Sequence, residues 1–271
     1  MVINILNLFI DVNLIYIDSF KQLNEYKSYL SGEYKLISKF DDFERPLFGA
    51  PKEETKNYDL YEKDNKIYQY HKNNNGNYYA LIEYNGKEVT IYNNKNNTFN
   101  DEYYLSQFAI NYFINTYSNG VILYSSSIYY KNKGIIFTAK SGAGKSTHRS
   151  LWTKYSDALV INDDKNLIAI ENDKLYIYPN PWCGKHLEQN NIRASLDFIV
   201  VLHQSSSNII EDVDKSFIFE QILHQIPIPK NHDLYAKIVD KLADIKMYYY
   251  GCNISYEAFE VINDRISSDL L

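Results

Sequence analysis

Residues 134–148 read Gly-Ile-Ile-Phe-Thr-Ala-Lys-Ser-Gly-Ala-Gly-Lys-Ser-Thr-His. An apolar run that favours a β-strand leads into a glycine-rich loop, and a helix-like stretch follows the Lys-Ser pair. Glycines let backbone N–H groups approach an anion, and a helix N-terminus adds the positive end of its dipole. A chance glycine-rich turn is the alternative. The spacing, the preceding strand and the following helix all favour a phosphate-binding loop.

The loop residues expected to bind the nucleotide are Ser141, Gly142, Ala143, Gly144, Lys145, Ser146 and Thr147. We expect Lys145 to reach the β- and γ-phosphates and the Ser146 hydroxyl to bind Mg²⁺. The usual pattern begins with a glycine where this chain has Ala139, and alanine is the smallest departure available. The sequence therefore predicts that the chain binds ATP together with Mg²⁺.

Two adjacent acidic residues, Asp163 and Asp164, follow the next apolar run, residues 158–161. An acid at a strand end beside such a loop is where Mg²⁺ is expected, because hard oxygen ligands must meet the phosphate oxygens. We assign Asp163 to the metal with Ser146, and the second carboxylate to the proton of an attacking hydroxyl. The sequence does not decide which acid takes which role, and a solvated turn is the alternative interpretation.

Together these motifs resemble the HPr serine kinase family and, more broadly, the P-loop kinases that include HPr kinase and ATP-dependent phosphoenolpyruvate carboxykinase. The resemblance spans residues 119–265 and includes a hairpin, the loop and the strand that carries the Asp pair. Small HPr-kinase-like proteins tend to carry Ser-Gly-x-Gly-Lys-Ser-Thr-His, Leu-Trp, Asn-Asp-Asp-Lys and Pro-Trp-Cys-Gly-Lys. Those motifs occur here at residues 141–148, 151–152, 162–165 and 181–185.

The resemblance implies an α/β P-loop kinase domain of HPr kinase/carboxykinase type over residues 119–271. Residues 1–118 are then a β-rich (α+β) accessory or substrate-recognition region. The implied reaction transfers the γ-phosphoryl group of ATP to a Ser or Thr hydroxyl of a peptide or small protein, with Lys145, Asp163 and Asp164 as the catalytic residues. Several small members of the family look like tailoring kinases for ribosomally made peptides. Because HPr kinases are hexamers, a homo-oligomer is a further implication.

The chain also departs from the family pattern. Tyr124 stands where HPr kinases usually have histidine, and residues 178–186 replace the glutamate–arginine signature expected downstream of the Asp pair. HPr itself is therefore a poor expectation as the substrate, and the reverse phosphorylase reaction is doubtful. Two other functions stay open: a small-molecule kinase for an amino acid or a sugar, and a nucleotide-binding switch without transfer chemistry. A carboxykinase is disfavoured, because members of that family are far longer.

Further candidate residues carry positive charge. Lys185 and His186 lie on a predicted loop, residues 179–191, and either could contact the transferring phosphoryl group. A solvated loop is the alternative. Arg193 is the only arginine between Arg149 and Arg265, which makes it a candidate phosphate or substrate contact. For Arg149 itself we expect a solvated or packing role.

Composition excludes several classes of function. The chain has 271 residues and is 45% hydrophobic, which allows one large domain or two small ones. A net charge of −6 argues against general nucleic-acid binding. There is no apolar run of about 18 residues, so neither a membrane helix nor a membrane partner is expected. The apolar start, residues 1–10, favours a strand over a signal peptide. Cys183 and Cys252 give no disulfide or zinc spacing, and the expected compartment is the cytoplasm.

Hydrophobic periodicity divides the chain into a β-rich first part and an α/β second part. Short β-like runs in the first part are residues 2–10, 13–17, 67–71, 78–84 and 89–92, and helical spacing follows over residues 101–117. We expect this part to be mainly antiparallel. The second part is predicted to begin with paired strands over residues 120–130 and 133–138. Expected helices there cover residues 145–155, 214–225 and 231–246 and a last helix that begins after Ser255, and further strands cover residues 166–170, 174–178, 196–202 and 247–250.

Overall fold

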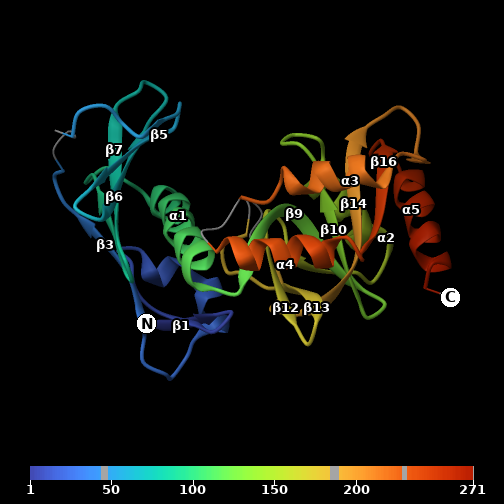
Figure 1. Cartoon of the computed structure of the whole chain (residues 1–271), viewed down its shortest axis with the longest axis horizontal. Helices are drawn as coiled ribbons and strands as arrows, with labels where there is room; N and C mark the ends of the chain where they lie inside the picture. The colour runs from blue at the N-terminus through green and yellow to red at the C-terminus, as the bar shows by residue number, and fades with distance from the viewer. Residues whose placement is uncertain (44–47, 184–188, 228–230, 271) are drawn as a thin grey trace. The chain divides into compact units, whose positions relative to one another are not determined.

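The computed structural model describes residues 1–43, 48–183, 189–227 and 231–270 (Figure 1). The chain divides into two compact units, Met1–Ser118 and Asn119–Leu271. Each unit contains one large β-sheet with helices packed on it, so the protein is a mixed α/β structure with two large sheets. None of the helices within these described ranges is long and apolar enough to cross a membrane.

The sheet of the first unit has the strand order β1-β2-β3-β8-β7-β6-β5-β4. Its strands are β1 (Val2–Ile5), β2 (Leu8–Asn13), β3 (Tyr34–Phe40), β4 (Glu53–Glu54), β5 (Tyr58–Lys63), β6 (Lys66–Lys72), β7 (Tyr78–Asn85) and β8 (Glu88–Asn93). The pairs β2–β3 and β3–β8 are parallel, and the remaining pairs are antiparallel. The helix α1 (Phe99–Tyr117) begins with a capping box between Thr98 and Asp101.

Two expectations for the first unit need correction. The apolar run at residues 2–10 is two strands, because Leu6 and Asn7 adopt positive φ angles of 50° and 62° and form a two-residue hairpin turn. No strand forms at residues 14–17, because β2 ends at Asn13. The carboxylate of Glu102 on α1 accepts hydrogen bonds from the backbone N–H groups of Ile15 and Tyr16, at 2.9 and 2.8 Å. These two donors are therefore used by the helix rather than by a neighbouring strand.

The second unit contains eight strands in its described residues. They are β9 (Gly120–Tyr130), β10 (Lys133–Thr138), β11 (Leu159–Asn162), β12 (Lys165–Glu171), β13 (Lys174–Tyr178), β14 (Ala194–Gln204), β15 (Ile209–Glu211) and β16 (Lys246–Cys252). The antiparallel strand β9 lies between β10 and β11, while β14 is parallel to both β10 and β16. Hence β10, β11, β14 and β16 all run in the same direction, and their carboxyl ends share one edge of the sheet.

Helices cover both faces of this sheet (Figure 1). The helices are α2 (Lys145–Tyr155), α3 (Lys215–Leu223), α4 (His232–Leu242) and α5 (Tyr256–Ser268). Side chains of a strand alternate between faces. Ile135 and Phe137 of β10 thus join the core with α2 and α5, whereas Ile136 joins the core with α3 and α4. The double cover explains why β10 and β14 are apolar along most of their length.

Most of the elements expected in this unit are confirmed. The paired strands at residues 120–130 and 133–138 are β9 and β10, and the helix expected at residues 145–155 is α2. Lys131 and Asn132 join the two strands with positive φ angles of 48° and 62°. Ser255 caps α5 by accepting a hydrogen bond from the N–H of Ala258. The short edge strand β15 was not expected, because three residues carry too little periodicity to be recognised.

Candidate functional site

The predicted phosphate loop connects the carboxyl end of β10 to the start of α2. Gly142 and Gly144 have φ angles of +80° and +98°, which side chains with a Cβ rarely adopt. A Cβ at either position would face open space, so the backbone conformation rather than crowding explains these glycines. Ala139, which replaces the first glycine of the usual pattern, is 3% exposed and packs into the core beside α2. Nothing in that packed position calls for glycine.

Lys145 and Ser146 occupy the first turn of α2, where backbone N–H groups have no acceptor within the helix. The ammonium of Lys145 folds back over the loop and donates to the carbonyl oxygen of Ala139 at 3.0 Å. Burial lowers the pKa of Lys145, and the negative charge of Asp164 acts in the opposite direction. The loop lysine and one acid of the Asp pair therefore lie close enough to interact electrostatically.

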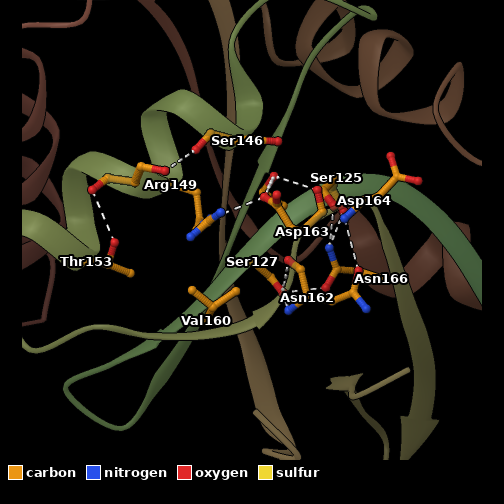
Figure 2. Close-up of polar contacts among 12 residues, drawn as sticks. Ser125, Ser127, Ser146, Arg149, Thr153, Val160, Asn162, Asp163, Asp164 and Asn166 are labelled. Carbon is orange, nitrogen blue, oxygen red and sulfur yellow. Dashed lines mark hydrogen bonds and ion pairs between the residues drawn. The ribbon is translucent and has the colours of Figure 1, made fainter. Parts of the chain in front are cut away.

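The two acidic residues that follow β11 point in different directions (Figure 2). Asp163 is turned towards α2, and its side chain is 1% exposed. Its Oδ1 accepts a hydrogen bond from the Ser126 hydroxyl at 2.9 Å and from Arg149 Nε at 3.2 Å. Asp164 is turned away from Arg149 and is half-buried. The two carboxylates therefore differ in burial and in hydrogen-bond partners.

Of the two roles expected for Arg149, solvated or packing, the structure rules out the first. Its side chain is 2% exposed and forms a buried ion pair with Asp163. The pairing of Arg149 with Asp163, which follows β11, depends on how α2 packs against the sheet. Spacing along one helix does not reveal such a partner.

A buried polar network holds the turn that carries both acids (Figure 2). The Asn162 side-chain oxygen accepts hydrogen bonds from the backbone N–H groups of Asp164 and Lys165, both at 3.0 Å. The Asn162 N–H in turn donates to the Ser127 hydroxyl at 3.2 Å. The Asn166 amide donates to the carbonyl and hydroxyl oxygens of Ser125, at 2.7 and 2.8 Å. The position of the Asp pair is thus fixed by side chains of β9, β11 and β12.

The three serines of β9 that take part in this network were not among the expected site residues. Ser125, Ser126 and Ser127 are fully buried in a strand whose flanks are apolar. Buried hydroxyls need hydrogen-bond partners. Three consecutive serines inside an apolar strand were therefore a usable signal, since at least one of them faces each side of the sheet.

The remaining predicted contacts have different outcomes. Arg193 precedes β14, a strand of 11 residues, and so lies roughly 30 Å from the carboxyl end beside the loop. Its guanidinium pairs with Glu171 at 3.0 Å and lies 4.3 Å from the centre of the Tyr176 ring. This position does not fit a contact with phosphates on the loop, and a contact of Arg193 with a substrate stays a prediction. Lys185 and His186 lie outside the described residues, so their contact with the transferring phosphoryl group stays a prediction.

Two groups beneath the loop are part of the core. His148 is 3% exposed and contacts the rings of Phe137 and Tyr250. Burial lowers the pKa of His148 to about 4 and raises the pKa of the Cys252 thiol to about 11. At neutral pH both side chains are therefore uncharged, and the thiol is a poor nucleophile. His148 is thus a packing residue of the core.

A pocket of about 460 Å³ lies on the other side of the loop. Its walls come from the loop, the carboxyl end of β14, β16, α3 and the turn that follows α3. The lining residues are Ala139, Lys140, Ser141, Gly142, Ala143, Val201, Leu202, His203, Gln204, Phe217, Gln221, Gln225 and Tyr249. Sequence analysis did not predict this pocket, because its walls are up to 110 residues apart in the chain (from Ala139 to Tyr249).

The residues present suit a weakly held metal better than a dedicated metal centre. No cluster of three or more His, Cys, Asp or Glu side chains suited to a metal occurs among the described residues. Mg²⁺ is usually held by one or two carboxylates together with substrate phosphates and water. Ser146, Asp163 and Asp164, beside a loop shaped for phosphates, fit that pattern.

Comparisons with known proteins find similarity among solved structures alone. Neither a protein-family model nor a curated protein sequence matches the chain. Among solved structures, the chain is similar to the HPr(Ser) kinase/phosphatase from Coxiella burnetii, at 11% sequence identity and a TM-score of 0.34. The alignment covers 55% of this chain and 98% of that chain. Similarity at this level indicates a distant relationship of fold at most and assigns no activity.

Proposed function

We propose that the protein is an ATP- and Mg²⁺-dependent kinase of P-loop type that phosphorylates a Ser or Thr hydroxyl of a peptide or small protein. One observation carries this proposal. The loop after β10 and the Asp pair after β11 share the same edge of the sheet, and the charge of Asp164 reaches Lys145. Phosphoryl transfer needs this combination of a phosphate cradle, a cation and two carboxylates.

The loop binds the phosphates in this proposal. The N–H groups of the first turn of α2 and the open backbone at Gly142 and Gly144 face the anion. Lys145 exchanges its hydrogen bond to the Ala139 carbonyl for the β- and γ-phosphate oxygens. When bound, Mg²⁺ would neutralise charge on the same oxygens. Ser146 and the Asp163 carboxylate are the residues that would hold the metal.

Asp163 and Asp164 take different roles because their surroundings differ. Arg149 and Ser126 hold one oxygen of Asp163 in place, which suits a fixed metal ligand. Asp164 is turned away from that ion pair and is half-buried, so it is accessible to an acceptor. The acceptor oxygen forms a bond to the γ-phosphorus as the bond to ADP breaks, and its proton passes to Asp164.

The peptide acceptor rests on the motif resemblance, and the acid pair alone suits any hydroxyl. The test therefore offers several acceptors to purified protein with γ-labelled ATP and Mg²⁺: peptides encoded beside its gene, free amino acids and sugars. We expect label on a peptide hydroxyl. Label on an amino acid or a sugar instead would contradict the peptide acceptor but keep the kinase.

Asp164→Asn tests the chemistry. Removing a general base typically costs about 10²- to 10⁴-fold in rate, and we expect that loss with little change in ATP affinity. Asp157→Asn is the matched control, because Asp157 is exposed just before β11 and is expected to retain full activity. ATP binding without transfer to any acceptor, or full activity in Asp164→Asn, would refute the proposal.

A further inference from the structure

Apart from Gln225, whose carbonyl accepts a hydrogen bond from the Tyr124 N–H of β9, the lining of the pocket beside the loop lies on the opposite side from the acids. Across the shared edge of the sheet the strands follow the order β11, β9, β10, β14 and β16. The Asp pair follows β11, the loop follows β10, and the pocket is bounded by the ends of β14 and β16. Neighbouring strands lie about 4.8 Å apart, so the acids lie roughly 10 Å to one side of the loop and the pocket begins about 5 Å to the other.

This order sets the direction in which a nucleotide must lie, if the proposed kinase function holds. The γ-phosphoryl group has to point towards Asp163 and Asp164, because those residues serve the metal and the acceptor. The other end of the triphosphate chain then leaves the loop on the β14 side. The pocket is the hollow that the nucleoside meets there. Its size falls within the range of small-molecule sites, roughly 300–1,000 Å³.

The side chains of the pocket match a flat, uncharged ring with polar edges. Phe217 is 39% exposed, and its ring lies 5.2 Å from that of Tyr249. Tyr249 in turn stacks on His203 at 4.7 Å. Exposed aromatic rings of this kind stack on nucleobases. The apolar wall alone would suit many ligands, so the class of ligand is inferred from the polar groups of the pocket.

The polar groups of the pocket are side-chain amides. Gln221 follows Phe217 by four residues on α3, which places its amide beside the exposed ring. Gln225 lines the pocket from the turn after α3. An amide both donates and accepts hydrogen bonds, as the edge of a base does. Among the described lining residues, Lys140 of the loop is the one lysine or arginine, and the His203 ring lies 2.7 Å from a Glu211 carboxylate oxygen. A charged peptide segment therefore has little to bind here.

We propose that this pocket binds the base of the nucleotide, and that Phe217 and Gln221 set the affinity and the selectivity for it. The inference rests on the proposed kinase function. Gln204, whose amide donates to the Gly142 carbonyl at 3.4 Å, connects the pocket to the loop.

The test compares ligands that share phosphates but differ in the base. Binding of Mg-ATP, Mg-GTP and inorganic tripolyphosphate is measured by calorimetry for the full chain and for Phe217→Ala and Gln221→Ala. Stacking on an aromatic ring contributes enough that Phe217→Ala is expected to weaken ATP binding about 10-fold or more. Tripolyphosphate binding is expected to stay unchanged in both variants. Lys145→Ala should weaken both ligands, and Glu220→Ala, an exposed change on the same helix, should weaken neither.

Each other result overturns the inference in a recognisable way. If ATP binds both variants as tightly as the unchanged protein, the base lies elsewhere, while the kinase proposal survives. If the variants lose transfer to the acceptor but keep ATP affinity, the pocket belongs to the acceptor. Equal loss of ATP and tripolyphosphate would mean that the changes disturb the loop itself. If the unchanged protein binds neither ligand, the inference and the proposed function fail together.

Discussion

The two sides of the phosphate loop are built on different principles. On the β11 side, Asp163, Arg149 and Ser126 are almost fully buried and bonded to one another. On the β14 side, Phe217 is 39% exposed and its glutamine neighbours are half-buried around a pocket. The buried side fixes charged groups in one arrangement, as a reaction centre requires. The open side leaves surface available for a ligand, as a binding site requires. In the proposed kinase, the buried side would serve the transfer step and the open side would bind the base.

The largest expected loss of stability comes from a substitution on the buried side. Arg149→Met would leave the Asp163 carboxylate buried without its cation, which typically costs about 3–5 kcal/mol of unfolding free energy. Both tryptophans, Trp152 and Trp182, lie in the second unit, so urea unfolding followed by tryptophan fluorescence reports on that unit. Phe217→Ala on the open side should cost clearly less, since that ring is already partly exposed.

The double variant Arg149→Met/Asp163→Asn is the control for this loss. Removing the stranded charge should recover part of the stability. A loss of less than about 1 kcal/mol in Arg149→Met would show that the acid side is not held by this ion pair.

Acid is expected to act on the buried groups next to the loop. The pKa of His148 is about 4 in the folded protein, below the value of about 6.5 for an unfolded histidine. The unfolded state therefore binds more protons, and stability is lost as the pH falls from about 6.5 to about 4. At pH 4.5, protonation of His148 in the unfolded state lowers the unfolding free energy by about 2.7 kcal/mol, at about 1.36 kcal/mol per pH unit.

The indole N–H of Trp152 donates to His148 Nε2 at 3.4 Å. His148→Gln removes the titration and keeps an acceptor for that N–H. The variant should lose less stability between pH 7 and pH 4.5 than the unchanged protein, measured by urea unfolding at both values. An identical acid loss in the two proteins would contradict a buried, uncharged His148.

The smallest effect concerns one hydroxyl. Ser126→Ala removes the donor to Asp163 and leaves that oxygen with Arg149 alone among the contacts described above. The expected cost is about 1–2 kcal/mol of unfolding free energy. Gln221→Ala on the open side should stay within about 0.5 kcal/mol, because its amide is not part of a buried network. An equal loss of unfolding free energy in Ser126→Ala and Gln221→Ala would contradict the difference between the buried side and the open side.

Local sequence predicted the parts of the site that depend on neighbouring residues. The strand before residue 139, the helix from Lys145 and the strand before the Asp pair follow from short-range periodicity and glycine placement. In the first unit the same reasoning failed at residues 13–17. There Glu102, a residue nearly ninety positions further on, accepts hydrogen bonds from Ile15 and Tyr16. Local propensity has no information about such a partner.

The sequence by itself determined that a strand, a glycine loop and a helix follow one another, and that two acids end the next strand. Only the tertiary structure decided that Asp163 pairs with Arg149 while Asp164 turns away, and that Arg193 lies at the far end of β14. It alone also placed a pocket opposite the acids. Backbone conformation is set largely by adjacent residues. Side-chain partners depend on strand order and register, which here join Ser126 to Asp163 across 37 positions of the chain.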